Sequence, residues 1–292
     1  MTVSDIGFFN SLADSITNTY QALQTTEGQL ATGKQVVEPS DNPSSFAGAA
    51  ELQTTVSAIN NDNALASDAQ NQLNATDGAL SQAASALDSA IASANEGANG
   101  TLTAAQMTDI AASVQNDLTQ VLASANFSYN GVYVFGGDRT LSAPFDSAGN
   151  YAGGGPGNSV TLSNGAQLQL TFDGQSVFGN ATGGLIGTLQ SLATALSSGN
   201  TSAVSATLAQ LNTAVDQLAQ TRAVIGAASQ FAQTLSQNAQ AQATSLTDSI
   251  GQLVDVNLAQ ASLQASQETT QANALVSLAS AAAKISLVNV LA

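Results

Sequence analysis

The longest regular pattern of apolar side chains runs from residue 52 to residue 94. Residues recur there at alternating spacings of four and three, which is the period of a helix that packs along other helices. Ten of the thirteen positions are apolar, and the full set is Leu52, Val56, Ile59, Asn63, Ala66, Gln70, Leu73, Asp77, Leu80, Ala84, Leu87, Ile91 and Ala94. Asn42 as a cap and Pro43 at the first helical position predict where this helix begins, and the glycines at 97 and 100 predict its end.

Three positions of this stripe are polar, namely Asn63, Gln70 and Asp77. A polar side chain on a helical seam costs stability and commonly fixes register or partner orientation. We therefore interpret these residues as determinants of how the long helix aligns with its neighbour.

Two further helices carry the same spacing. Thr103 followed by Gln106 forms a capping-box pattern at the start of one of them. Its apolar stripe is Met107, Ala111, Val114, Leu118, Val121 and Ala125, and we expect it to pack antiparallel on the long helix. The other helix starts at Asn200-Thr201, and its stripe is Val204, Leu208, Leu211, Val215, Leu218 and Ile225, with Arg222 at one seam position.

The two ends of the chain repeat the pattern with smaller side chains. The N-terminal seam consists of Phe9, Leu12, Ile16, Thr19, Leu23, Thr26 and Leu30. The C-terminal seam consists of Ile250, Val254, Leu258, Ala261, Ala265, Glu268, Ala272, Leu275, Ala279 and Ala282. Alanine-rich seams let helices approach closely but bury little area per residue, so these helices need partners. Two partners fit this pattern: the rest of the same chain in one bundle, or other subunits in an assembly.

The composition changes between the second and third helices. Of the 24 glycines, 14 lie between residues 131 and 187, and eight of the 13 aromatic residues lie between 127 and 178. This composition predicts a small β-rich insertion. Within it, a hairpin with a three-residue loop places Val160 opposite Leu168 and Leu162 opposite Ala166, with Gly165 in a left-handed conformation.

Together these elements predict a mainly α fold, an elongated antiparallel bundle or coiled coil of N- and C-terminal helices with a small β-rich insertion. Residues 1–42 and 247–292 are expected to form a terminal helical assembly domain. Residues 43–130 and 184–246 form a helical middle domain in this interpretation, and residues 131–183 form the outward-facing insertion.

The charge balance narrows the range of partners. Twenty acidic and four basic residues give a net charge of −16. Nucleic acid and acidic membranes require clustered Lys and Arg, whereas Lys34, Arg139, Arg222 and Lys284 lie far apart in the chain. We therefore expect no nucleic-acid partner. We also expect no membrane insertion, because a lysine and several Ser and Asn residues interrupt the apolar stretch 272–292.

The residue types that are missing exclude most enzyme chemistry. The chain has no Cys, His or Trp, so Ser-His-Asp triads, Cys or His nucleophiles and Cys/His zinc sites cannot form. We expect no enzymatic activity, no cofactor and no metal. A function of a different class, a carbohydrate-binding or hydrolytic insertion on a helical stalk, would depend on Tyr133, Tyr151, Asp138, Asp146 and Asp173, but no carboxylate pair or aromatic platform can be placed among them.

Several short segments resemble signatures of the flagellin superfamily, in particular of its hook-associated members. Near the N-terminus these are Thr32-Gly33-Lys34 and Pro39-Ser40-Asp41-Asn42-Pro43. In the insertion they are Asn130-Gly131-Val132-Tyr133-Val134-Phe135-Gly136-Gly137 and Pro144-Phe145. Near the C-terminus they are Arg222-Ala223-Val224-Ile225-Gly226-Ala227, Asp255-Val256-Asn257-Leu258-Ala259 and Ser286-Leu287-Val288-Asn289-Val290-Leu291. The chain departs from this pattern where Asn257 and Asn289 replace a common Asp, and where Lys34 is the one basic residue of the N-terminal region.

The resemblance implies a structural component of the bacterial flagellum that joins the hook to the filament, with filament flagellin as the alternative. It implies self-assembly as a ring or helix beside a neighbouring hook-associated protein and flagellin, through terminal helices that are disordered in the monomer. It also implies an extracellular location, reached through the flagellar export machinery with a chaperone and without a cleaved signal peptide. The first 15 residues, which lack a basic segment followed by a continuous apolar one, are consistent with that route.

Overall fold

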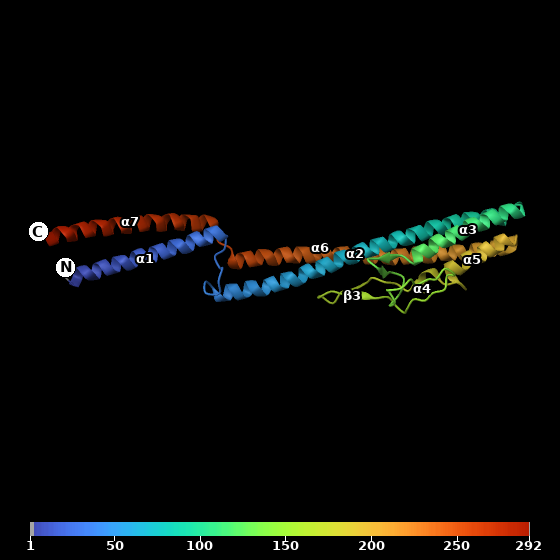
Figure 1. The fold of residues 1–292 in the computed structure, drawn as a ribbon, viewed down its shortest axis with the longest axis horizontal. Coiled ribbons are helices and arrows are strands. Elements are labelled where there is room, and N and C mark those ends of the chain that lie inside the picture. Colours follow the sequence, from blue (N-terminus) through green and yellow to red (C-terminus); the bar gives the residue numbers. More distant parts are fainter. Residues whose placement is uncertain (1–2, 292) are drawn as a thin grey trace. The chain divides into compact units, whose positions relative to one another are not determined.

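The computed structural model describes the backbone of residues 3–291 and the side chains of residues 7–284. The elements in chain order are α1 (Val3–Thr32), α2 (Pro43–Ala98), α3 (Ala104–Ala125), β1 (Ser128–Tyr129), β2 (Val132–Tyr133), β3 (Ser159–Thr161), β4 (Gln167–Gln169), α4 (Gly174–Phe178), α5 (Gly184–Ser197), α6 (Thr201–Val254) and α7 (Leu258–Leu291). The predicted mainly helical fold with a small β-rich insertion is confirmed (Figure 1).

The chain forms two compact units. The terminal unit consists of Met1–Ser57 and Ala243–Ala292, and the central unit consists of Ala58–Gln242. The boundaries fall inside α2 and α6, so each of these long helices contributes residues to both units.

Helix α2 begins and is buried as its sequence predicts. The side-chain oxygen of Asn42 accepts a hydrogen bond from the Ser45 amide at 3.1 Å, which caps the first turn. All thirteen positions of the predicted stripe are buried or half-buried. A second buried face, lined by Ala79, Ala83, Ala86 and Ala90, is not predicted by the heptad pattern. It belongs to the main core of the central unit, and alanine permits close packing there because its side chain is a single methyl group.

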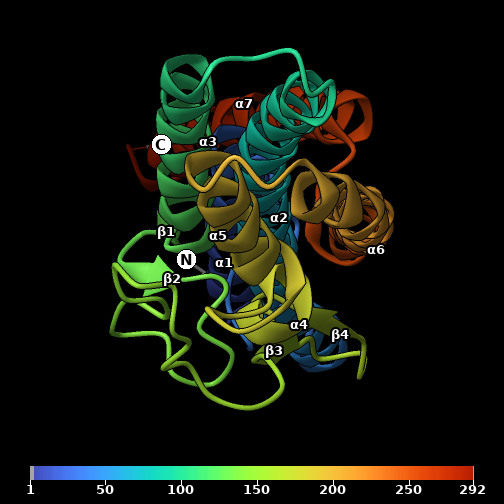
Figure 2. The same cartoon turned by 90° about the vertical axis from the view of Figure 1, so that its right-hand side faces the viewer.

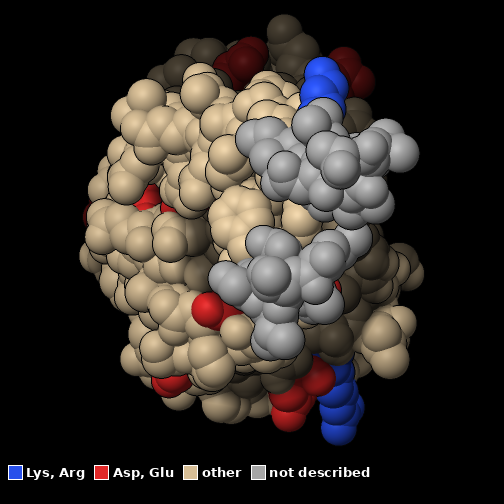
Figure 3. All heavy atoms as spheres, turned by 90° about the vertical axis from the view of Figure 1, so that its left-hand side faces the viewer, with Lys and Arg blue, Asp and Glu red and all other residues tan. Residues whose placement is uncertain are grey.

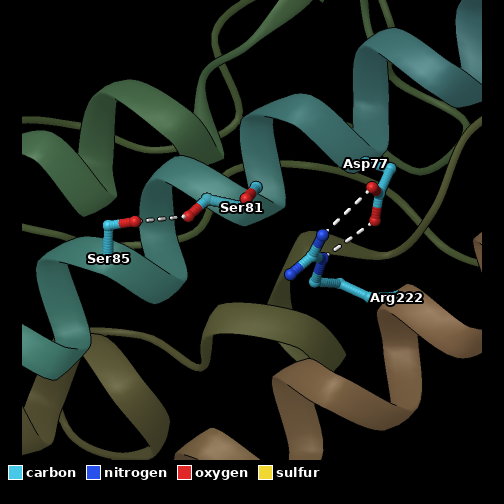
Figure 4. A network of polar contacts seen from close by, with 4 residues as sticks. All are labelled: Asp77, Ser81, Ser85 and Arg222. Atoms are coloured by element: carbon cyan, nitrogen blue, oxygen red, sulfur yellow. Dashed lines mark hydrogen bonds and ion pairs between the residues drawn. The ribbon is translucent and has the colours of Figure 1, made fainter.

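Polar side chains align α2 with α6 in the central unit. Arg222 donates to both carboxylate oxygens of Asp77, at 2.8 and 3.1 Å, as Figure 4 shows. In the same figure Ser85 donates to the Ser81 carbonyl within α2 at 3.1 Å. The Asp77 and Arg222 side chains are 39% and 36% exposed, so this ion pair contributes little net stability and mainly specifies the alignment.

Two further contacts continue this alignment. Ser229 donates to Asn74 at 2.7 Å, and Ser236 donates to Asn63 at 2.6 Å. The residue numbers of the partners on α6 decrease as those on α2 increase, as expected for two antiparallel helices. Asn63 and Asp77, two of the three polar seam residues predicted to set register, therefore pair across the seam. The third, Gln70, is half-buried.

The core of the central unit is formed by α3, α5 and the adjoining parts of α2 and α6. Thr103 and Gln106 form the predicted capping box at the start of α3. Helix α5 is not predicted from the apolar pattern, because it follows directly on a glycine-rich loop. It packs beside α3 (Figure 2) and buries Leu185, Ile186, Leu189, Leu192 and Leu196.

The predicted hairpin is confirmed in its register and its loop. Val160 lies opposite Leu168, and the Leu162 amide donates to the Ala166 carbonyl at 2.9 Å. Gly165 has φ +83°, the left-handed conformation expected for its position. The hairpin docks on α2, where the Asp62 carboxylate accepts hydrogen bonds from the amide and hydroxyl of Ser163.

The Phe135-Gly136-Gly137 segment forms the centre of the insertion. Phe135 is fully buried, and its ring meets Phe178 edge to face at 4.9 Å between centroids. Gly137 has φ +63°, and a Cβ at this position would lie 2.3 Å from the Gly155 carbonyl oxygen. Any other residue there would clash with backbone, so the glycine permits two loop segments to lie against each other.

The insertion is also tied to the end of α3. The Asn126 side chain accepts from the Phe145 amide and donates to the Phe145 carbonyl, both at 2.9 Å. The Asn126 side chain thus bonds to both backbone groups of Phe145, as a residue of a neighbouring antiparallel strand would.

A buried carboxylate in α3 yields a stability prediction. Asp117 is 6% exposed, and its Oδ2 has no hydrogen-bond partner among the described residues. Burial raises the pKa of this carboxyl, and a hydrogen bond with Ser89 partly offsets the rise. The stabilisation that follows from a raised pKa is complete at low pH and is lost as the pH rises through that pKa.

We therefore expect Asp117→Ala to increase the free energy of unfolding at neutral pH by about 1–3 kcal/mol, because an unpaired buried oxygen is removed. The gain should shrink as the pH falls toward about 4, the ordinary range of an Asp. Urea unfolding at a series of pH values measures this effect, with Asp109→Ala as the control at an exposed position of the same helix. An equal effect of both substitutions would contradict the explanation.

Candidate assembly surface

The two terminal helices lie side by side in the terminal unit. Helix α1 packs along α7, and the residues near both chain ends lie at the same end of this pair (Figure 1). Every position of the predicted N-terminal seam is buried or half-buried: Phe9, Leu12, Ile16, Thr19, Leu23, Thr26 and Leu30. On α7, Ala261 and Ala272 are buried, and Leu275, Ala279 and Ala282 are half-buried.

The C-terminal seam does not form one continuous run. Helix α6 ends at Val254 and α7 begins at Leu258, so Ile250 and Val254 belong to a different helix from the rest of the seam. These two residues pack in a small separate cluster, and Leu258 is 57% exposed. The break has a local signal that the apolar spacing hides, because the Asn257 side chain caps α7 by accepting from the Gln260 amide at 3.2 Å.

Backbone hydrogen bonds join the two segments that connect these helices to the rest of the chain. We call residues 33–42 and 254–257 the clasp. The Val254 carbonyl accepts from the amides of Gln35 and Val36 at 2.7 and 3.2 Å, and the Val256 amide donates to the Gly33 carbonyl at 3.0 Å. Gly33 ends α1 with φ +73°, a common conformation after the last helical residue.

The clasp has a small apolar core of its own. Val36 is 7% exposed and packs with Ala49 and Val254, and Phe46 and Ile250 lie against these residues. The next residue along the chain, Val37, is 50% exposed.

Asp41, Asn42 and Pro43 shape the end of the clasp, where the chain enters α2. The Asp41 carboxylate accepts hydrogen bonds from the Glu38 and Val37 amides, both at 2.9 Å. These two hydrogen bonds lower the pKa of Asp41 below its ordinary value. The stabilisation from a lowered carboxyl pKa is present above the unfolded-state pKa and is lost as the pH falls through the lowered one.

Large apolar side chains remain exposed mainly on the terminal unit. It is the smaller unit, yet it carries eight of the twelve exposed large apolar residues in the described part of the chain: Phe8, Tyr20, Val37, Leu253, Leu258, Leu263, Val276 and Leu278. Leu263 and Leu278 lie off the face of α7 that contacts α1. In Figure 3, viewed from the end at which α1 starts, most of the described atoms in view belong to residues other than Lys, Arg, Asp and Glu. The terminal pair therefore presents apolar side chains both between its helices and outward.

The remaining signature residues are distributed in the central unit. Phe135, Gly136 and Gly137 form the centre of the insertion, and Arg222 pairs with Asp77 on the α2–α6 seam. Gly226 lies half-buried one turn further along α6. The side chains of the closing motif, residues 286–291, lie outside the described set.

The residues considered for a carbohydrate or hydrolytic site have structural roles. Asp146 closes a turn by accepting hydrogen bonds from Ala148 and Asn150, and Asp173 caps α4 by accepting from the Gln175 amide. Burial, followed by the charge of Asp173, raises the pKa of Tyr151 to about 12. Tyr133 is half-buried in β2, and Asp138 is exposed.

The described residues offer neither a metal-binding cluster nor a membrane-spanning helix. Among the side chains that the structure describes, residues 7–284, no group of three or more acidic residues is placed to hold a metal ion. Within the same range, no helix combines the length and apolar character needed to cross a membrane.

Sequence comparison relates the chain to flagellar proteins. Residues 3–140 match the family described as the bacterial flagellin N-terminal helical region. The chain is 29% identical over 185 residues to flagellar hook-associated protein 3 of Salmonella typhimurium, and 30% identical over 170 residues to the protein of the same name from Escherichia coli. These matches cover 62% and 57% of this chain, and they span 58% and 53% of the two curated relatives.

Comparison of the fold gives a consistent result. FlgL from Bacillus cereus aligns with a TM-score of 0.60 and 22% identity, covering 70% of this chain and 98% of that one. A putative flagellar hook-associated protein from Vibrio parahaemolyticus aligns with a TM-score of 0.68 and 16% identity, covering 74% and 100% of the two chains. At these identities the likeness concerns the fold.

The neighbouring residues Val36 and Val37 provide a matched test of the clasp. Val36→Asp places an unpaired charge in the small apolar core, so we expect the clasp to open and the amides of Gln35, Val36 and Val256 to exchange faster with deuterium. Val37→Asp adds the same charge at an exposed position and should leave these amides protected. Equal exchange in the two variants would show that the apolar core does not hold the clasp closed.

Proposed function

We propose that this chain, whose residues 3–140 match the bacterial flagellin N-terminal helical region, is a structural subunit of the bacterial flagellum that joins the hook to the filament. The curated relatives that bear the name hook-associated protein 3 support this role, as does the fold shared with proteins of the FlgL type. The protein acts in this role by binding its neighbours and not by catalysis.

The observation that carries the proposal is the apolar outer surface of the α1–α7 pair. A monomeric protein rarely leaves many large apolar side chains exposed on one small unit, and such a surface is typical of a contact with other protein. Few charged residues interrupt it, which lets highly acidic subunits approach each other there. In this proposal the terminal segments, residues 1–42 and 247–292, form the assembly domain.

The remaining parts of the proposal follow from this role. The partners are other copies of the chain, a neighbouring hook-associated protein and flagellin. The helical bundle, residues 43–130 and 184–246, is the middle domain, and the insertion at 131–183 faces outward. The subunit reaches the outside of the cell through the flagellar export machinery with a chaperone and without a cleaved signal peptide.

Substitutions on the outer surface of α7 test the assembly role. Leu263 and Leu278 are 61% and 49% exposed, so replacing both with Ser removes apolar surface without opening the core. We expect cells carrying this double variant to export the subunit but to lose it into the medium, with a loss of swimming. Leu141→Ser is the matched control, because this leucine is 89% exposed on the insertion.

Export, attachment to the flagellum and swimming should be measured together with the thermal unfolding of each variant. Normal swimming by the double variant would count against an assembly surface on α7. Loss of swimming with unchanged unfolding would support it.

Filament growth separates a junction protein from filament flagellin. Flagellin polymerises into long filaments under salting-out conditions because its subunits stack on each other without limit. We expect the purified full-length protein to form at most short assemblies under these conditions, as judged by electron microscopy. Long filaments grown from this chain alone would favour flagellin.

A further inference from the structure

The chain contains three Asn-Gly pairs, and the structure holds them in different ways. They are Asn99-Gly100, Asn130-Gly131 and Asn164-Gly165. In such a pair the glycine nitrogen can attack the side-chain amide carbon of the asparagine, because glycine has no side chain that shields its nitrogen. The attack requires the asparagine backbone to rotate until the nitrogen faces that carbon. A pair whose backbone is fixed in a turn is therefore protected, and a pair in a free connection is not.

Asn164-Gly165 is fixed in the loop of the β3–β4 hairpin. The Gly165 amide, which carries the attacking nitrogen, donates to the Leu162 carbonyl at 2.9 Å. The side-chain oxygen of Asn164 accepts a hydrogen bond from the Ala166 amide, also at 2.9 Å. Both reacting groups are thus engaged, and the reaction would have to break two hydrogen bonds first.

Asn130-Gly131 is fixed by the strands on either side of it. The pair forms the two-residue turn between β1 and β2, and Tyr129 lies opposite Val132 directly beside the turn. Asn130 has φ +51° and Gly131 has φ +82°, the combination of positive values that two-residue hairpin turns favour. Rotation at Asn130 would pull the two strands apart, so this pair is protected as well.

Asn99-Gly100 lies in the connection between α2 and α3 and is held least. Both residues are exposed, and a Cβ on Gly100 would meet no atom within 4 Å. Among the residues whose side chains are described, none forms a hydrogen bond with the Gly100 amide or with the Asn99 side chain. The Asn99 amide does donate to the Glu96 carbonyl at 3.2 Å, but this bond precedes the part of the backbone that must rotate.

We propose that Asn99 is a site of spontaneous covalent modification, at which the chain converts to aspartate and isoaspartate while Asn130 and Asn164 persist. The Gly100 nitrogen loses its proton and forms a bond to the side-chain carbonyl carbon of Asn99, and the side-chain nitrogen leaves as ammonia. Water then opens the resulting succinimide ring. Attack by water at the side-chain carbonyl carbon gives aspartate, and attack at the main-chain carbonyl carbon gives isoaspartate.

The modification changes the end of α2 in two ways. Either product adds a negative charge at the C-terminal end of the helix, where the helix dipole disfavours it. Isoaspartate also adds a methylene group to the main chain ahead of the cap of α3, in which the Thr103 amide donates to Gln106. The last turn of α2 has little room to adjust, because a Cβ on Gly97 would lie 2.3 Å from the Leu196 side chain. None of this depends on how the subunit assembles.

The test incubates the folded, full-length protein in mildly alkaline buffer and follows each asparagine by mass spectrometry of the digested chain. We expect Asn99 to react at least about tenfold faster than Asn130 and Asn164, because the other two react only after their turns open locally. Enzymatic methylation of the new carboxyl group distinguishes isoaspartate from aspartate.

The same incubation in denaturing urea is the matched control, since all three pairs share the Asn-Gly sequence. There the three rates should agree to within about threefold, because no turn protects any of them. Asn99→Gln, whose longer side chain would have to close a larger ring, should abolish the reaction at this position and leave the other two rates unchanged.

Equal rates at the three pairs in the folded protein would overturn the proposal, as would an unreactive Asn99. A rate difference that persisted in urea would also overturn it, because sequence and not structure would then select the site. The swimming and export of the Leu263 and Leu278 variant are measured separately, so neither result decides the other.

Discussion

The alignment of α2 with α6 is the constraint on which the central unit depends. Its seam is built largely from small and medium-sized side chains, which tolerate several registers because no single fit dominates. The contacts of Asn63, Asn74 and Asp77 with Ser236, Ser229 and Arg222 satisfy their polar groups in the observed register. The hairpin packs against residues from both helices, Ala66 and Ala232, so its site exists only when this alignment is kept.

The parts of the fold that could be predicted from sequence are those determined by residues that lie close together in the chain. Cap residues and heptad spacing identify α2 and α3, and a three-residue loop with Gly165 in the left-handed conformation identifies the register of the hairpin. The break between α6 and α7 was missed because Val254 and Leu258 keep the spacing of a continuous helix. The structure ends α6 there because the Val254 carbonyl bonds to the distant Gln35 and Val36 amides, and such a non-local partner leaves no trace in the spacing.

The candidate assembly surface could likewise be predicted only in part. The faces of α1 and of most of α7 that meet each other follow from periodicity, which places Leu12 and Ala261 on them. The exposed surface does not follow from periodicity, since Leu263 and Leu278 belong to no repeating stripe. The insertion was recognised by its glycines, but the contacts that require them, such as that of Gly137 with Gly155, are long-range.

The clasp has a mechanical consequence. The segment that leaves α1 and the segment that enters α7 are joined by backbone amides and carbonyls, with Val254 accepting two of the three hydrogen bonds. Tension applied along either terminal helix is therefore shared with the other at this point, and two covalent connections carry the load together. Because these bonds involve main-chain atoms, side-chain variation around them can change the stiffness of the joint without removing the connection itself.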